Sequence, residues 1–131
     1  MNLFSIIQEI QEAYHMGLQI YAGKGFDTQK AERFFKERRI SYQRVDVLKF
    51  GIGKRELESV AAAAGLDSLC DKESKAFRES VIAYTQNRDT ILSGLMEKPQ
   101  LLRLPIVRSG KLATVGYCPD VWEKWIEEKK I

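Results

Sequence analysis

Residues Tyr21 to Phe35, YAGKGFDTQKAERFF, have the pattern of a strand end, a glycine-bearing turn and the first turns of an amphipathic helix. The start of a helix presents unpaired backbone N–H groups and the positive end of the helix dipole, which stabilise a thiolate, a phosphate or another oxyanion. A reactive side chain is expected at this position, but the chain has Phe26, followed by Asp27, Thr28 and Gln29. We expect Phe26 to fill the space beside the turn and close the surface, and the alternative is that it stacks on a ligand in a retained pocket.

Two further features near helix starts could do chemistry. Thr28 and Lys30 could hold a small anion together with backbone N–H groups, and the alternative is a solvated lysine on a helix capped by Asp27 or Thr28. Cys118 precedes Pro119 at the start of the last predicted helix, where a thiolate would also meet a positive dipole end. The alternative for Cys118 is a small apolar residue packed at a strand–helix corner. The sequence leaves both pairs of alternatives open.

Composition excludes several function classes. The chain has 131 residues, 44% hydrophobic and 30% charged, with a net charge of +3 and basic residues interleaved with acidic ones. We expect no direct nucleic-acid binding, because a dedicated binder concentrates its cations on one face. We also expect no membrane span, because the sequence has no run of about 18 apolar residues. Cys70 and Cys118 form no C-x-x-C pair, which predicts a reducing, cytoplasmic location. His15 has no ligand neighbours, so we expect no metal and no cofactor.

The length predicts one domain over residues 1–131. Residues 1–16 have the helical spacing of an appended amphipathic helix, and about 53–99 have that of a predominantly helical insert that includes a helix over Asp89–Lys98. The remaining segments alternate between strand and helix patterns. They predict strands at Leu18–Ala22, Tyr42–Val47, Leu104–Val107 and Leu112–Val115, a turn over Arg108–Lys111, a helix with Ala31, Phe34 and Phe35 inward, and a last helix after Pro119 with Val121, Trp122, Trp125 and Ile126 inward.

This order, a β–α–β unit, a helical insert and a β–β–α unit, predicts an α/β fold of the thioredoxin-like kind, with a mixed four-stranded sheet flanked by helices. Five stretches strengthen that prediction by their order and spacing: IYAGKGFDTQKAERFF, ISYQRVDVLKFGIGKREL, SKAFRES, TILSGLMEKPQLLRLPIV and GKLATVGYCPDVWEKW. Together they resemble the arsenate reductase (ArsC)/Spx-like family over roughly residues 19–126.

The resemblance implies specific site residues. In the family a cysteine at the first helix is the redox residue, and that position falls here on Phe26, while the second cysteine of the C-x-x-C form falls on Gln29. The arginines that bind the oxyanion fall on Glu73 and on Leu104, one residue after Arg103. Pro105 is retained and is expected to be cis beside the site. The remnant pocket predicted on this basis contains Gly25, Phe26, Asp27, Thr28, Lys30, Arg103 and Pro105.

These residues predict binding in place of catalysis. A thiol reaction on an oxyanion needs a nucleophile and cations, whereas the matched positions provide Phe26, Glu73 and Leu104. We therefore expect a non-catalytic member that acts through protein–protein contacts in transcriptional or stress regulation, and the Spx resemblance implies RNA polymerase as the partner. The alternative is a glutaredoxin-like or arsenate reductase-like oxidoreductase that uses Cys118 or takes another substrate in the old pocket.

Overall fold

The computed structural model describes residues 17–131, so the predicted N-terminal helix over 1–16 and His15 lie outside the described part. Its core is one four-stranded sheet with the order β2-β1-β3-β4. Strand β1 (Leu18–Ala22) pairs in parallel with β2 (Tyr42–Asp46) and antiparallel with β3 (Ile106–Ser109), which pairs antiparallel with β4 (Leu112–Val115). The predicted mixed sheet and thioredoxin-like order of elements are confirmed.

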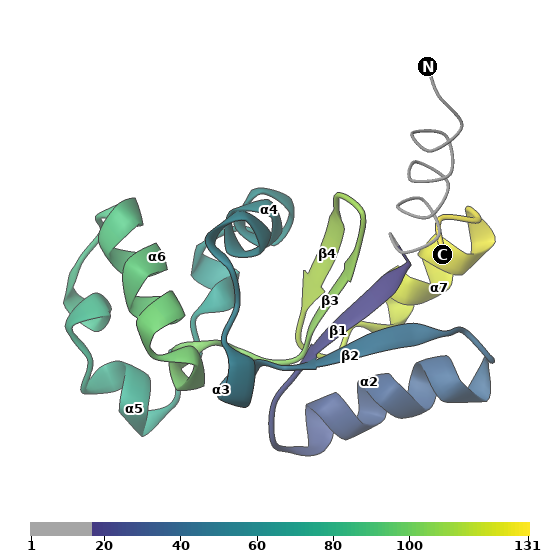
Figure 1. Cartoon of the computed structure of the whole chain (residues 1–131), viewed down its shortest axis with the longest axis horizontal. Coiled ribbons are helices and arrows are strands. Elements are labelled where there is room, and N and C mark those ends of the chain that lie inside the picture. Colours follow the sequence, from purple (N-terminus) through teal and green to yellow (C-terminus); the bar gives the residue numbers. More distant parts are fainter. Residues whose placement is uncertain (1–16) are drawn as a thin grey trace, which may run out of the picture.

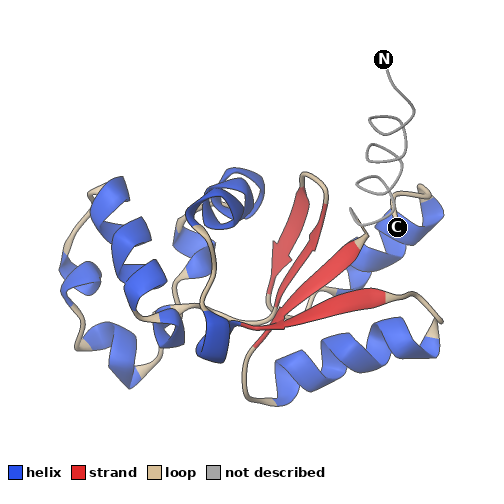
Figure 2. Ribbon diagram, viewed as in Figure 1, coloured by secondary structure: helices blue, strands red, loops and turns tan. Residues whose placement is uncertain are grey.

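Helices cover the sheet in two groups, as Figures 1 and 2 show. Helix α2 (Phe26–Glu37) connects the two parallel strands, and α7 (Pro119–Glu127) follows the hairpin and packs beside α2. The insert stands at the other side of the sheet, where its helix α4 contacts strand β4. Its elements are α3 (Val47–Phe50), α4 (Lys54–Ala64), η1 (Asp67–Leu69), α5 (Lys75–Arg78), η2 (Val81–Tyr84), α6 (Arg88–Glu97) and η3 (Pro99–Leu101).

The two groups bury two different cores. The core beneath α2 and α7 is rich in aromatic rings: Phe35 and Trp122 are fully buried, with ring centroids 5.0 Å apart. The core beneath the insert is mainly aliphatic and includes Leu57, Val60 and Leu95. Alternating residues of β1 divide between them, because successive strand side chains point to opposite faces of a sheet. Ile20 belongs to the aromatic core and Tyr21 to the aliphatic one.

Three predicted element boundaries are wrong by a few residues. The strand expected over Leu104–Val107 begins at Ile106, and its turn is shorter than the expected four residues because Ser109 still pairs with Leu112. Gly110 at φ 59° makes this tight turn possible. Val47 opens α3 rather than ending β2. None of the helices in residues 17–131 has the length and apolar character needed to cross a lipid bilayer.

Candidate functional site: a mixed-charge cleft beside two helix starts

Helix α2 begins without a side-chain cap. Its N-cap residue is Gly25, whose φ of 121° lies in the left-handed region that favours glycine, so the prediction that Asp27 or Thr28 caps the helix is wrong. The Thr28 hydroxyl instead accepts a hydrogen bond from the backbone N–H of Gly23, at 3.2 Å. Because Thr28 is buried and its oxygen is used to hold the turn, it offers little to an anion.

Phe26 does not close the surface as predicted, since 78% of it is exposed. It lies one turn before Lys30 and two turns before Phe34 on the same ridge of α2. The α7 region contacts this ridge only from Lys30 onward: the Lys30 ammonium lies 5.7 Å from the Tyr117 ring centroid, and the buried Phe34 packs edge-on against Trp122 at 5.2 Å. Phe26 stays exposed because α2 begins before these contacts do.

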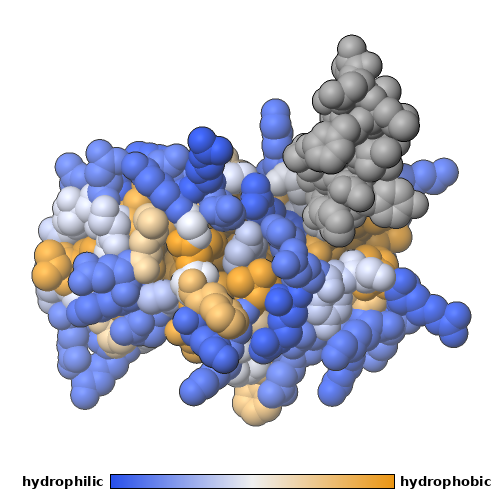
Figure 3. Space-filling view, viewed as in Figure 1, coloured by the Kyte–Doolittle hydropathy of each residue, from blue (hydrophilic) through white to orange (hydrophobic). Residues whose placement is uncertain are grey.

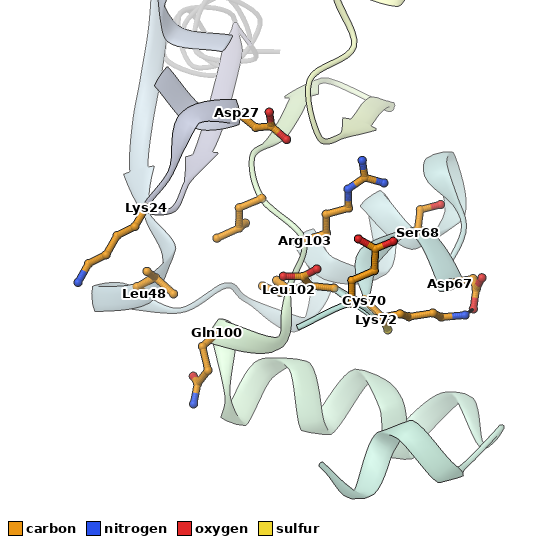
Figure 4. A pocket seen from close by; sticks show the side chains of 13 residues that line it. Lys24, Asp27, Leu48, Asp67, Ser68, Cys70, Lys72, Gln100, Leu102 and Arg103 are labelled. Atoms are coloured by element: carbon orange, nitrogen blue, oxygen red, sulfur yellow. Dashed lines mark hydrogen bonds and ion pairs between the residues drawn. The ribbon is translucent and has the colours of Figure 1, made fainter. Parts of the chain in front are cut away.

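A cleft of about 730 Å³ lies between the start of α2, the η1 part of the insert and the chain leading into β3 (Figure 4). Its lining is dominated by charged and polar side chains: Lys24, Asp27, Leu48, Asp67, Ser68, Cys70, Asp71, Lys72, Glu73, Gln100, Leu102, Arg103 and Leu104. Three of these residues are basic and four are acidic, and the ammonium of Lys72 is already paired with Asp67. The cleft therefore lacks the excess of cations that a multiply charged oxyanion requires.

Arg103 is held in the cleft by both its backbone and its side chain. Its N–H donates to the carbonyl of Leu69 at 2.8 Å, next to a bridge between Cys70 and Leu102, which ties the insert to this segment. The guanidinium lies against Gly116, where an added Cβ would come within 3.1 Å of a guanidinium nitrogen. Gly116 has φ 85°, so glycine both permits the turn and leaves room for the guanidinium.

The structure separates the predicted pocket residues into three groups. Asp27 and Arg103 line the cleft, and Figure 4 shows their side chains directed toward the same space. Gly25, Phe26 and Lys30 are exposed at the surface. Thr28 and Pro105 are buried, and the peptide bond before Pro105 is cis, as the resemblance implies. These last five residues do not line the cleft.

Several cleft residues had no signal in the sequence. Ser68 and Asp71 come from the insert, and Gln100 comes from η3. Their separation from Asp27 along the chain hides the grouping, because only the folded sheet brings these segments together. The one available signal was the resemblance, which placed a family arginine at Glu73 and so marked this part of the insert.

Neither thiol is placed like an activated nucleophile. Cys118 is the N-cap residue of α7, as predicted, but it is only partly exposed and its Sγ lies 3.4 Å from the carbonyl of Val115. Burial raises the pKa of the Cys118 thiol, although the nearby Arg103 charge acts in the opposite direction. Cys70 is buried, and its pKa is likewise raised by burial. Reactive thiols have lowered pKa values, and burial shifts the pKa of both of these thiols in the opposite direction.

Within residues 17–131 no three His, Cys, Asp or Glu side chains come together in a way that could hold a metal ion. The acidic residues of the cleft are spread over its walls, and Asp67 is paired with Lys72. The lining offers many hydrogen-bonding groups: carboxylate and amide acceptors as well as guanidinium, ammonium and hydroxyl donors.

Comparison with known proteins finds relatives that match most of the chain. A curated relative, the global transcriptional regulator Spx 2 of Oceanobacillus iheyensis, is 27% identical over 117 residues, which is 87% of each chain. An arsenate reductase from Vibrio cholerae superposes with a TM-score of 0.74 at 19% identity, covering 82% of this chain and 95% of that one. A protein from Bacteroides fragilis described as ArsC family related gives a TM-score of 0.74 at 20% identity, covering 84% and 98%.

The sequence identities to these two solved structures, 19% and 20%, are low, so these matches establish a shared fold and no more. The family model gives the wider statement, because it matches residues 11–125, which include every strand of the sheet, the whole insert and most of α7. The chain belongs to the ArsC family, with the thioredoxin-like fold of its arsenate reductase relatives.

Proposed function

We propose that this chain is a non-catalytic member of the ArsC family that acts through contact with another protein, in transcriptional or stress regulation. The observation that carries the proposal is the start of α2, where the helix presents an exposed Phe26 in the position that the resemblance assigns to the family's redox cysteine. An exposed phenylalanine has no redox chemistry, but it is a good contact for a partner.

The relative named as a global transcriptional regulator supports the regulatory part of the proposal, since it matches most of both chains. RNA polymerase is the partner that the Spx resemblance suggests. A regulator without a thiol at this helix start would bind its partner equally well under reducing and oxidising conditions. That behaviour distinguishes the proposed function from redox-controlled regulation.

The partner experiment is a binding titration of the full chain against RNA polymerase from the organism that encodes it, by biolayer interferometry. We expect saturable binding that is unchanged when dithiothreitol is replaced by diamide. The Phe26→Ser variant should bind more weakly, and Arg88→Ala, an exposed change on the first turn of α6, should bind like the parent chain. Absence of binding, or binding abolished by diamide, would contradict the proposal.

The competing function is a thiol oxidoreductase that uses Cys118. It is favoured by one observation, the place of Cys118 at the start of α7 with the Arg103 charge acting on it. Because burial raises the pKa of Cys118, little thiolate is present at neutral pH, and its alkylation should be slower than that of free cysteine and still rise above pH 9. The measurement is the rate of iodoacetamide labelling by mass spectrometry, with Cys118→Ser as control; rapid labelling near pH 7 would favour the oxidoreductase.

A further inference from the structure

Asp27 presents a carboxylate and Arg103 a guanidinium to the same cleft, and the two groups form no ion pair with each other. Both line the cleft, and Figure 4 shows them directed toward a common space. Within residues 17–131 neither takes part in an ion pair. Their charges also reach the same neighbour, since both act on the Cys118 thiol. The space between them is therefore bounded by an acceptor on one side and donors on the other.

The opposite charges of Asp27 and Arg103 in one cleft determine which ligands can bind there. An anion would be attracted to Arg103 but repelled by Asp27, Asp71 and Glu73, and a cation would meet Arg103 itself. A neutral group that both donates and accepts hydrogen bonds satisfies both side chains. The peptide group is such a ligand, because its N–H can donate to the Asp27 carboxylate while a carbonyl accepts from Arg103.

The neighbouring surface adds an apolar component. Phe26 is 78% exposed at the start of α2, and Leu48, which lines the cleft from α3, is 39% exposed. Figure 3 shows apolar patches among hydrophilic side chains on the face in view. A small polar molecule would leave these exposed apolar residues uncovered. A protein partner can cover them with its own apolar side chains, so this surface favours a protein partner.

Arg103 is also prepared for binding. Its backbone N–H donates to the carbonyl of Leu69, which fixes where the side chain leaves the main chain, and the exposed guanidinium lies against Gly116 with no hydrogen bond or ion pair of its own within residues 17–131. The cleft volume of about 730 Å³ accommodates a few residues of an extended chain.

We propose that the cleft binds an extended peptide segment of the partner protein, with a backbone peptide group held between the Asp27 carboxylate and the Arg103 guanidinium and an apolar side chain of the segment on Phe26. This inference rests on the proposed function, in that it assigns a binding mode to the protein contact. Asp27 and Arg103 select the peptide backbone, and Phe26 with Leu48 favours apolar side chains next to it.

The test begins with a linear 12-residue phage-display library selected on the immobilised full chain. Enriched clones are synthesised and their dissociation constants measured by calorimetry. We expect the enriched peptides to contain apolar residues and to need no charged residue. They should bind about tenfold more weakly to Asp27→Ala and to Arg103→Ala, because each variant loses a hydrogen bond to a charged group. Arg88→Ala, outside the cleft, should stay within about twofold, and melting temperatures confirm that all variants are folded.

Backbone recognition is tested by methylating the peptide nitrogens one at a time. One N-methyl group should weaken binding to the parent chain by about tenfold, and the same change should have little effect on Asp27→Ala, because the acceptor is already absent. Equal losses in the two proteins would overturn the proposal. It would also be overturned if the enriched peptides lost binding when their carboxylates were changed to amides, or if no clone were enriched.

A competition experiment distinguishes binding of an extended peptide from binding of any small amide. Displacement of the peptide by an equal concentration of N-acetyl-leucine amide would overturn the requirement for an extended segment. The outcome is also distinct from that of the polymerase titration. Peptide binding without polymerase binding would retain this inference and exclude that partner, whereas polymerase binding without peptide binding would overturn this inference alone.

Discussion

Helices α2 and α7 lie side by side, yet they begin in different ways. The first residue of α2 is Phe26, exposed after an N-cap glycine, whereas α7 starts with Pro119 after the half-buried thiol of Cys118. Both starts offer the positive end of a dipole, but one carries no thiol and the other carries a thiol whose pKa is raised by burial. A helix start thus supports thiol chemistry only when a sulfur atom and solvent access occur together.

The largest effect is expected at the buried residue that anchors α7. Trp122 is fully buried against Phe34 and Phe35, and its indole N–H donates to Thr114 at 2.8 Å. Trp122→Ala should lower the free energy of unfolding by about 3–5 kcal/mol, because it leaves a cavity in the aromatic core. The measurement is urea denaturation followed by circular dichroism. A loss below about 1 kcal/mol would mean that α7 does not depend on this core.

A smaller loss is expected at the start of α2. Thr28→Val keeps the shape of the side chain but removes the acceptor for the Gly23 N–H, so the free energy of unfolding should fall by about 1–3 kcal/mol. Thr90→Val in the first turn of α6 is the exposed contrast: its hydroxyl donates to the Asn87 side chain at 3.1 Å in contact with solvent, so its loss should cost less than that of a buried hydroxyl. If the two substitutions cost the same, the hydrogen bond from Gly23 is not what holds the α2 turn.

The chemical difference between the helix starts can be removed by Phe26→Cys. This change places an exposed thiol at the positive end of α2, where its pKa should be lowered, and we expect its alkylation at pH 7 to be about tenfold faster than that of Cys118. Lys36→Cys, in the last turn of the same helix, is the matched control because the dipole has the opposite sign there. Equal rates for the two introduced thiols would show that the α2 start does not activate sulfur.

The smallest effect is expected for Phe26→Ser. An exposed side chain contributes little to folding, so the free energy of unfolding should change by no more than about 0.5 kcal/mol while partner binding weakens. Thermal melting measures the first quantity and the interferometry titration the second. A large loss of stability would show that Phe26 packs on the domain and is not free for a partner.

Much of the fold could be predicted because it depends on local patterns. The spacing of Ala31, Phe34 and Phe35 fixes the buried face of α2, and all three are buried. The same reasoning failed for Val121, which was expected to face inward and is 41% exposed, since a helix of nine residues buries only a narrow stripe. Phe26 was also misjudged, because its exposure depends on where α7 begins and not on its own neighbours in the sequence.

The candidate site was less predictable than the fold. Asp27 and Arg103 each appeared among the predicted pocket residues, but their joint arrangement depends on the pairing of β1 with β3, which connects distant parts of the chain. No local sequence pattern predicts that the Arg103 guanidinium packs against Gly116. Close packing of this kind is decided by three-dimensional contacts, whereas periodicity reports only which face of an element is apolar.

The short ladder between the insert and the segment before β3 has a consequence for motion. Asp71 donates its N–H to the carbonyl of Leu101, and Arg103 donates to that of Leu69, on either side of the bridge between Cys70 and Leu102. These two amide hydrogens can exchange with solvent only when the ladder opens, so their exchange rates should rise and fall together. A segment bound at Arg103 would slow both, and protection at Asp71 would then report occupancy of the cleft from within the insert.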